Sequence, residues 1–375
     1  MEFYIFFASA LLIPICFPYV KTPRDLSIET KSQLSLFFSI LMILFVAGFR
    51  GLNVGADSKQ YASAYDQLKS LSISDALTVP IRSWSGYYTY SLEKGYRLYN
   101  KIVGLFGGSS QAIIFCNSLI IAILLYRLIR RNSPYFGLSI WLYVTLGFFQ
   151  TEMNMTRNAI AILLCLNATA YIKARKLVKY ALLIMLASTF HSTALVFIPL
   201  YWIINYIELT PKRLKILAIL SIATGLIGTQ VYYLLLKFAP SRYALYLVLA
   251  KSETEGTILV FLFLGIFLFV WFFCGKKLDA NTFVMIDNTG AWMLILMILS
   301  FSLSMTISVF TRVAALFSPY LIIYYPEMIS CGISNKRNRR IIIVALVLAL
   351  FIVYAFRLSV NNIGQTIPYS FCWET

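Results

Sequence analysis

Residues 177–206 read LVKYALLIMLASTFHSTALVFIPLYWIINY, and this apolar stretch decides how the chain crosses a membrane. A membrane span needs ~20 residues, so this stretch is too long for one ordinary span and too short for two. A single span would also move the later basic clusters to the other side of the membrane, against the positive-inside rule. We therefore predict a short or re-entrant pair of helices joined at Phe190, His191 and Ser192.

The tip of this helix pair is expected below the outer surface of the membrane. Each arm has about 14 residues, or ~21 Å of helix, whereas the hydrocarbon core is ~30 Å thick. Non-helical backbone at that depth is tolerated only where protein or trapped water satisfies its polar groups. The tip, with His191, would then form the floor of a cavity that opens outward.

The rest of the chain has the composition of a membrane protein. Of its 375 residues, 60% are hydrophobic and only 13% are charged, and the mean hydropathy is +0.78. A soluble core cannot absorb so much apolar sequence. We predict an all-α polytopic membrane protein in which residues 1–375 form a single integral-membrane domain of about 12 transmembrane helices. The apolar runs lie near residues 3–20, 33–48, 111–126, 135–149, 155–172, 177–190, 192–206, 214–235, 257–274, 290–310, 312–326 and 341–356.

The net charge of +17 is explained by membrane topology, and no nucleic-acid partner is needed. The basic clusters follow the odd-numbered spans, and these loops hold 19 of the 32 basic residues but 6 of the 15 acidic ones. Basic loops face the cytoplasm, so both termini are expected on the outer side. The clusters begin at Lys21, Arg127, Lys173, Lys212, Lys276 and Lys336.

The segment 49–110 is expected to form one large outer loop. It is rich in tyrosine and serine, as in SWSGYYTYSLEKGYRLYN at residues 83–100. Aromatic faces beside hydroxyl groups suit sugar rings, whereas an aromatic belt at the membrane interface is the alternative. Gly51 and Gly55 would let the backbone turn sharply where the second span ends, aiming Arg50 and Asp57 into a cavity.

Four cationic or titratable residues gather at outer helix ends on this topology, namely Arg50, Arg157, His191 and Arg312. A charge within the bilayer is costly, so it normally has a partner or a ligand. Arginine offers a planar fork of donors that matches phosphate oxygens, which predicts a cationic pocket for a diphosphate. Alternatively, Arg50 and Arg312 reach the lipid headgroups, Arg157 forms a local salt bridge with the nearby Glu152, and His191 is structural.

Two acids of the outer loop, Asp57 and Glu93, are candidates for the general base that activates a sugar hydroxyl, as is His191. A turn-stabilising Asp57 and a solvated Glu93 are the alternatives. The sequence has no DxD or CxxC motif and no outer carboxylate cluster at ligand spacing. We therefore expect no metal and no cofactor, with arginines holding the diphosphate.

Five segments together resemble the EpsG-like membrane proteins, a branch of the O-antigen polymerases (Wzy). They occur in order between about residues 45 and 325 as FRGLNVGADSKQY, EKGYRLYNKI, MTRNAIAILL, ASTFHSTALVFIPLY and FTRVAALFSPY. Lys59 and Gln60 depart from the expected small or hydroxyl residues. The residues that match the family's segments are Arg50, Gly55, Asp57, Tyr61, Glu93, Gly95, Tyr96, Arg157, His191 and Arg312.

The resemblance implies the GT-C-like fold of membrane glycosyltransferases that use polyprenyl donors. The implied reaction lies on the periplasmic side of a bacterial inner membrane. A glycan on undecaprenyl diphosphate is transferred to the non-reducing end of a lipid-linked repeat unit, as in surface polysaccharide and lipopolysaccharide biosynthesis. Asp57, Glu93 and His191 would be catalytic, while Arg50, Arg157, Arg312, Tyr61 and Tyr96 would bind the substrate or its diphosphate.

The partners implied by the resemblance are the lipid-linked oligosaccharide, as donor and acceptor, the lipid bilayer, and a separate chain-length regulator protein. Two other functions stay open at this point. An O-antigen ligase also uses arginine and histidine on the outer face, but the order of the segments favours a polymerase. A lipid-linked oligosaccharide flippase or another transporter would carry charges in a central lumen and show an internal repeat, and the sequence has no such repeat.

Overall fold

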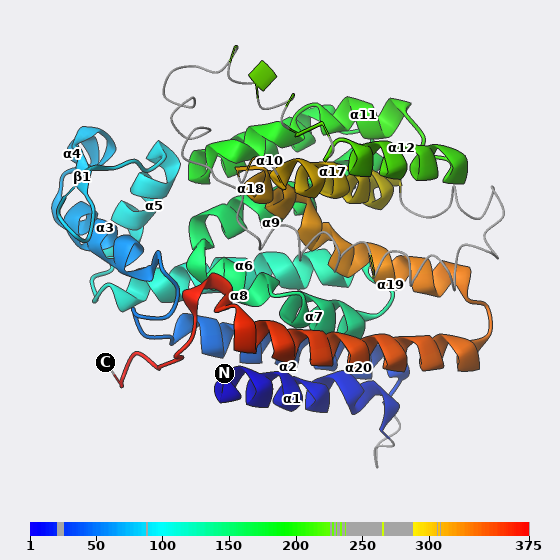
Figure 1. Ribbon diagram of the computed structural model, residues 1–375. Coiled ribbons are helices and arrows are strands. Elements are labelled where there is room, and N and C mark those ends of the chain that lie inside the picture. The colour runs from blue at the N-terminus through cyan, green and yellow to red at the C-terminus, as the bar shows by residue number, and fades with distance from the viewer. Residues whose placement is uncertain are drawn as a thin grey trace. The chain divides into compact units, whose positions relative to one another are not determined.

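The computed structural model describes residues 1–20, 26–87, 89–225, 288–305, 307 and 309–374, with a few scattered positions between 227 and 265. These residues are predominantly helical (Figure 1). The chain divides into two compact units. The first unit comprises Met1–Tyr201 and Ile343–Thr375, and the second comprises Trp202–Ile342. Each unit is described by itself below.

Long apolar helices form the body of the first unit. Four described helical segments are long and apolar enough to cross a membrane, which confirms an α-helical membrane protein. The predicted total of 12 spans stays a prediction, and the run 257–274 lies outside the described residues. The four segments are α1 with the following 3-10 turn η1 (Glu2–Tyr19), α2 (Ile28–Gly48), α6 (Gln111–Asn132) and α20 (Lys336–Val360).

Shorter helices follow the apolar runs between residues 135 and 173. Gly147 separates two of them because its left-handed backbone, with φ of +86°, ends the first helix and turns the chain into the next. The third helix packs against both α6 and α10. These elements are α7 (Phe136–Thr145), α8 (Phe148–Asn154) and α9 (Thr156–Lys173).

The structure confirms the predicted helix pair at residues 177–206. Helix α10 (Leu177–Phe190) ends one residue before His191, and the 3-10 helix η2 (Ser192–Phe197) begins directly after it. The chain then folds back along α10. This is seen in the 2.5 Å hydrogen bond that the Tyr180 hydroxyl of α10 donates to the Phe197 carbonyl of η2. Helix α11 (Leu200–Tyr206) completes the second arm. The pair therefore forms a tight hairpin with His191 at its tip.

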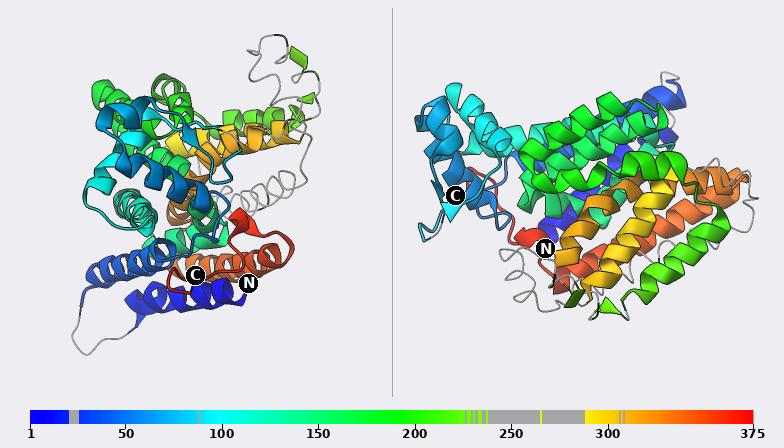
Figure 2. Two further views of the ribbon diagram at one scale, coloured as in Figure 1. Left: turned by 90° about the vertical axis from the view of Figure 1, so that its left-hand side faces the viewer. Right: turned by 90° about the horizontal axis from the view of Figure 1, so that it is seen from above.

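The segment between α2 and α6 folds into a small helical layer with its own core. It lies at one end of the long helices of the first unit (Figures 1 and 2). Its core combines Tyr61, Tyr65 and Tyr96 with apolar residues at the start of α6. The layer contains α3 (Ser58–Ser70), α4 (Ile73–Thr78), the antiparallel pair β1 (Ile81–Arg82) and β2 (Thr89–Tyr90), in which Ile81 pairs with Tyr90, and α5 (Lys94–Leu105).

Both termini of the first unit lie at the same end as this small layer. The tail after α20, which includes the 3-10 turn η4 (Ile363–Gln365), returns to the exit of α2. There Gly51 N–H donates to the Ser370 carbonyl at 2.8 Å, and the Tyr4 hydroxyl donates to the Thr366 carbonyl at 3.2 Å. Both termini of this unit therefore lie near the 49–110 segment, and their placement on the outer side of the membrane stays a prediction.

Basic clusters of the first unit lie at the opposite helix ends. Helix α6 begins beside the exit of α2, where Gln111 donates to the Gly48 carbonyl at 2.8 Å, and it ends in Arg130 and Arg131. Helix α9 runs the same way and ends at Lys173. One end of this unit therefore carries the small layer, and the other carries the basic loops.

The second unit packs helices α12 (Pro211–Ala223), α17 (Asn288–Ser304), α18 (Val309–Phe317) and α19 (Leu321–Gly332), with the 3-10 turn η3 (Ser318–Tyr320) before α19. The amide group of Asn288 connects α17 to the preceding chain, because it donates to the Ile204 carbonyl at 2.8 Å and accepts from Leu209 N–H at 3.0 Å. A side chain at Gly290 would overlap the ring of Tyr324, so this glycine allows α17 and α19 to pack closely.

Candidate functional site

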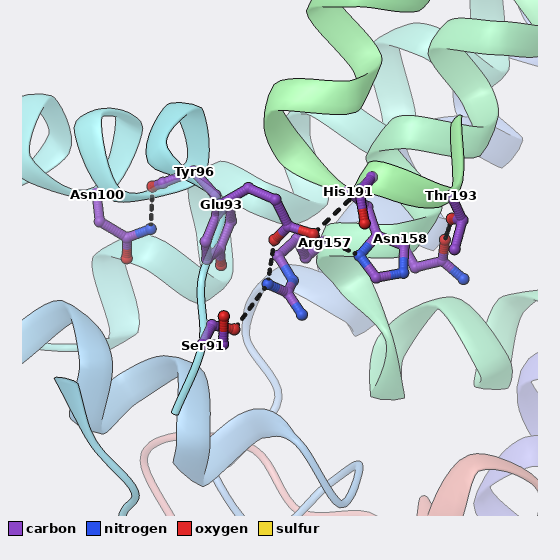
Figure 3. A network of polar contacts seen from close by, with 9 residues as sticks. Ser91, Glu93, Tyr96, Asn100, Arg157, Asn158, His191 and Thr193 are labelled. Carbon is purple, nitrogen blue, oxygen red and sulfur yellow. Dashed lines mark hydrogen bonds and ion pairs between the residues drawn. The ribbon is translucent and has the colours of Figure 1, made fainter. Parts of the chain in front are cut away.

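Glu93 is the centre of a charged network in the first unit. It is the residue before α5, and its carboxylate points toward two side chains from other helices (Figure 3). Oε2 accepts a 2.5 Å ion-paired hydrogen bond from Nη1 of Arg157. Oε1 lies 3.1 Å from Nδ1 of His191 and also accepts from Ser192 N–H at 3.1 Å. The network therefore joins three of the predicted site residues.

Arg157 enters the network from the first turn of α9 and is largely buried, with 12% of its side chain exposed. Its guanidinium lies over the rings of Tyr90 and Tyr96, 5.7 and 6.0 Å from their centroids. In the described part of the chain its hydrogen bonds, to Glu93 and to the Ser91 carbonyl at 3.4 Å, all use Nη1. Nη2 and Nε are thus available for a further acceptor, as an arginine that binds phosphate requires.

His191 owes its position to the break between α10 and η2. Its backbone is extended, with φ of −153°, so the imidazole leaves the helix axis and reaches Glu93. The contact uses Nδ1, and 24% of the side chain is exposed. A carboxylate that holds Nδ1–H fixes the tautomer in which Nε2 carries a lone pair. The geometry therefore gives His191 a nitrogen that can accept a proton.

The electrostatic environment keeps Glu93 ionised. Burial raises the pKa of this carboxyl, but the His191 hydrogen bond, the Arg157 charge and the Ser192 amide together lower the pKa below its usual value. An ionised Glu93 compensates the Arg157 charge and remains an acceptor for Nδ1–H of His191. The network therefore keeps a carboxylate, a guanidinium and an imidazole in contact with one another.

Gly95 explains why α5 comes close enough to the tip of α10 for this network to form. A Cβ atom at Gly95 would lie 2.3 Å from Oγ1 and 2.4 Å from Cβ of Thr189. No side chain fits at that spacing, so only glycine allows the approach. The EKG sequence thus combines the acid with the glycine that brings it to His191.

Tyr61 and Tyr96 belong to the core beside this network. Both are buried, and their rings form an edge-to-face pair with centroids 6.0 Å apart. Nδ2 of Asn117 donates to the Tyr96 hydroxyl at 2.9 Å. Burial raises the pKa of Tyr96 to about 12, so its hydroxyl is protonated at neutral pH. Their predicted role in binding substrate stays a prediction, and the contacts place Tyr96 beneath the guanidinium of Arg157.

Arg50 lies inside the protein, with none of its surface exposed. It donates to the carbonyls of Ala47 and of Met153, the latter at 2.9 Å, and lies 3.2 Å from the Ser118 hydroxyl. We expected a sharp turn to aim this side chain into an outer cavity, but the structure packs it among backbone carbonyls inside the protein. The side chain instead connects the exit of α2 to α6 and to the end of α8, while its predicted contact with a diphosphate is untested.

Asp57 sits in the glycine turn that precedes α3. Gly55 has a left-handed φ of +88°, as a sharp turn requires, and a Cβ atom there would lie only 3.0 Å from the Met153 carbonyl oxygen. The Asp57 N–H donates to Oδ1 of Asn154 at 3.0 Å, which holds the turn close to the start of α9. The structure therefore places Asp57 near the helix that carries Arg157, and its catalytic role stays a prediction.

Arg312 is exposed on α18 in the second unit. The predicted convergence of Arg312 with Arg157 and His191 therefore stays a prediction.

Among the described residues, no three histidine, cysteine or acidic side chains gather as metal ligands would. The sequence did not identify three residues that contact the network. The Ser91 carbonyl accepts from Arg157, Ser192 N–H donates to Glu93, and Thr189 lies against Gly95. The only indication of them in the sequence is that they lie within two residues of Glu93 or His191.

These features define a helical membrane protein with a partly buried acid, arginine and histidine network at one end of the long helices of its first unit. The chain belongs to the EpsG family, whose model matches residues 33–371. Members of this family are glycosyltransferase-like polymerases. No curated protein and no solved structure gave a significant match. The resemblance seen in the sequence is thereby confirmed at the level of the family.

Proposed function

We propose that this chain is a surface-polysaccharide polymerase of the bacterial inner membrane. It would transfer a glycan from undecaprenyl diphosphate to the non-reducing end of a lipid-linked repeat unit on the periplasmic side. The observation that carries the proposal is the contact of Glu93 with both Arg157 and His191. This contact combines a proton acceptor and a cation in one site, which is what glycosyl transfer from a diphosphate needs.

In this mechanism His191 is the general base. The acceptor hydroxyl oxygen attacks the anomeric carbon of the donor sugar, and the bond from that carbon to the diphosphate oxygen breaks. The hydroxyl proton moves to Nε2 of His191 while Glu93, bonded to Nδ1, stabilises the imidazolium that forms. Glu93 is then a positioning residue, and the proton leaves His191 to solvent after each transfer.

Arg157 would stabilise the leaving diphosphate. Its free Nη2 and Nε match two phosphate oxygens, and the rings of Tyr90 and Tyr96 hold its guanidinium plane. Because Glu93 compensates one positive charge, a diphosphate needs a second cation. We propose that Arg312, exposed on α18, supplies it, while Arg50 adds positive potential from within the protein.

The proposed periplasmic site is supported by the polarity of the first unit. The network lies at the end that carries the small helical layer, and basic residues such as Arg130 and Lys173 end the helices that run away from it. Basic loops favour the cytoplasmic side of a membrane. The chain would then meet its lipid-linked substrates from the bilayer, and a separate regulator protein would set the chain length.

Transfer by the purified full chain in lipid nanodiscs tests the proposal. Undecaprenyl-diphosphate-linked repeat units from the strain that carries the chain serve as donor and acceptor, and released undecaprenyl diphosphate and glycan length are measured. The proposal expects a ladder of multiples of the repeat unit with one lipid diphosphate released per bond. The same chain is also reconstituted into sealed vesicles, where movement of the substrate across the membrane without any new glycosidic bond would contradict the proposal and indicate a transporter.

A further inference from the structure

A groove outside the Glu93 network runs along the surface of the small helical layer. This open groove has a volume of about 860 Å³, and residues of α3 form one wall. Helix α3 turns Tyr61, Tyr65 and Leu68 toward the core, while Lys59, Ser63, Asp66, Gln67 and Ser70 line the groove on the other side of the helix. The groove is therefore separated from the Tyr61 and Tyr96 pair by the width of α3.

Trp84 forms an aromatic surface in this groove. Its side chain is 56% exposed, although its neighbours Ile81 and Ser83 are buried. Nζ of Lys59 lies over the indole, 5.4 Å from the ring centroid. Lys59 therefore holds the ring in place while more than half of the side chain stays open to solvent. Such an exposed tryptophan suits the apolar face of a sugar ring.

Two glutamines of α3 fix the strand segment that carries Trp84. Oε1 of Gln60 accepts from Trp84 N–H at 3.1 Å. Gln67 accepts from Arg82 N–H and donates to the Arg82 carbonyl, both at 2.9 Å. These residues are seven positions apart and so lie on the same side of the helix. The aromatic surface is thus built on a rigid helix and not on a loose loop.

We propose that this groove is a carbohydrate-binding subsite that holds the growing glycan away from the reaction centre. Trp84 would stack on a sugar ring, and the polar side chains of Lys59, Ser63 and Asp66 would bind its hydroxyl groups. The proposal rests on the proposed polymerase function. It also gives Lys59, which departs from the family pattern, a defined role in binding sugar.

Binding and product length test the subsite separately. Oligosaccharides released by mild acid from the strain's lipid-linked glycan are titrated against the full chain in nanodiscs, with Kd measured by calorimetry. Trp84→Ala is expected to weaken binding at least about tenfold, and Trp84→Phe to retain most of it. Trp84→Ala should also shorten the product ladder while the first bond still forms. Tyr87→Ala is the matched control, because Tyr87 is 91% exposed nearby but does not line the groove.

Equal Kd values for the wild type and Trp84→Ala would overturn the subsite. So would a wild-type chain that polymerises lipid-linked units but does not bind the released oligosaccharides. A wild-type chain that binds them but forms no bond would instead contradict the polymerase function and leave the groove as a sugar site. Lys59→Ala, which also removes the contact above the indole, is a second variant and is expected to weaken binding in the same direction.

Discussion

Oε1 of Glu93 lies 3.1 Å from Nδ1 of His191, although 98 residues separate them along the chain. Glu93 sits at the start of α5, and His191 sits at the tip of the α10 hairpin. The same carboxylate also pairs with Arg157 of α9. Three separate segments therefore depend on one acid, which makes Glu93 the residue through which the site is assembled.

Replacing His191 by asparagine separates positioning from proton transfer. Asparagine keeps a donor close to the position of Nδ1, so the contact with Glu93 should survive, but it has no base in place of Nε2. The expected result is a loss of about 10²–10⁴-fold in the rate of glycan transfer with normal expression. Thr193→Ala in the same hairpin is the control and should keep near wild-type rates. Equal rates for His191→Asn and Thr193→Ala would exclude His191 as the base.

Arg157→Lys retains the positive charge but removes the planar fork of donors. A lysine could pair with Glu93 but could not also offer two parallel N–H groups to a diphosphate. We expect transfer to fall about 10²-fold or more, with weaker binding of undecaprenyl diphosphate. Thermal unfolding of the variant in detergent should change little. Full activity with lysine would mean that Arg157 acts only as an ion-pair partner.

The stability of the chain should depend on pH through Glu93. Its folded-state pKa is lowered, so the network contributes stability above the unfolded value of about 4.5 and loses it as the pH falls through the lower folded-state pKa. Below about pH 4.5, the unfolding temperature of the wild type should therefore fall more steeply with decreasing pH than that of Glu93→Gln, in which position 93 no longer titrates. Parallel curves for the two proteins would contradict the assigned charge state.

Gly95→Ala should inactivate the site without touching a charged group. The added methyl would overlap Oγ1 and Cβ of Thr189, so α5 must move away from the α10 tip and carry Glu93 with it. We expect transfer to drop at least about tenfold, because small displacements in a site are costly. The double variant Gly95→Ala/Thr189→Gly should regain part of the activity, because it removes the Thr189 side chain that the methyl overlaps. The control Lys94→Ala, at an exposed position of the same helix, should have no effect. A fully active Gly95→Ala would show that the close approach is not needed.

Arg50 is expected to matter mainly for folding. In Arg50→Leu the carbonyls of Ala47 and Met153 lose their donor inside the protein. An unsatisfied buried polar group costs about 1–3 kcal/mol, so the variant should unfold at a clearly lower temperature. Unchanged unfolding together with lost undecaprenyl diphosphate binding would instead support Arg50 as a direct ligand.

Much of the helical arrangement follows from the sequence because apolar runs of span length have few alternatives in a membrane. The break at His191 was predictable because 30 residues cannot form two full spans, and α10 does end at Phe190. Arg157 and His191 were expected on one face from their helix ends, whereas the contact of Glu93 with both residues depends on the packing of α5 against α10 and was not predicted. The total number of spans and the position of Arg312 relative to these residues cannot be derived in this way.

Other features escape sequence patterns because they depend on tertiary contacts. The tyrosine-rich segment looked like a surface for sugars or a membrane belt, yet Tyr61, Tyr65 and Tyr96 form a core. Tyrosine suits both settings, and only packing decides between them. The burial of Arg50 depends on carbonyls at distant positions such as Met153, which no local pattern reveals.

A structure of the full chain in nanodiscs with undecaprenyl diphosphate bound tests the central claim most directly. We expect the diphosphate at the end of the first unit that carries the small helical layer, with a phosphate oxygen ~2.7–3.0 Å from a guanidinium nitrogen of Arg157 and His191 beside it. Binding of the headgroup at the end that carries Arg130 and Lys173, away from Glu93, would contradict the account.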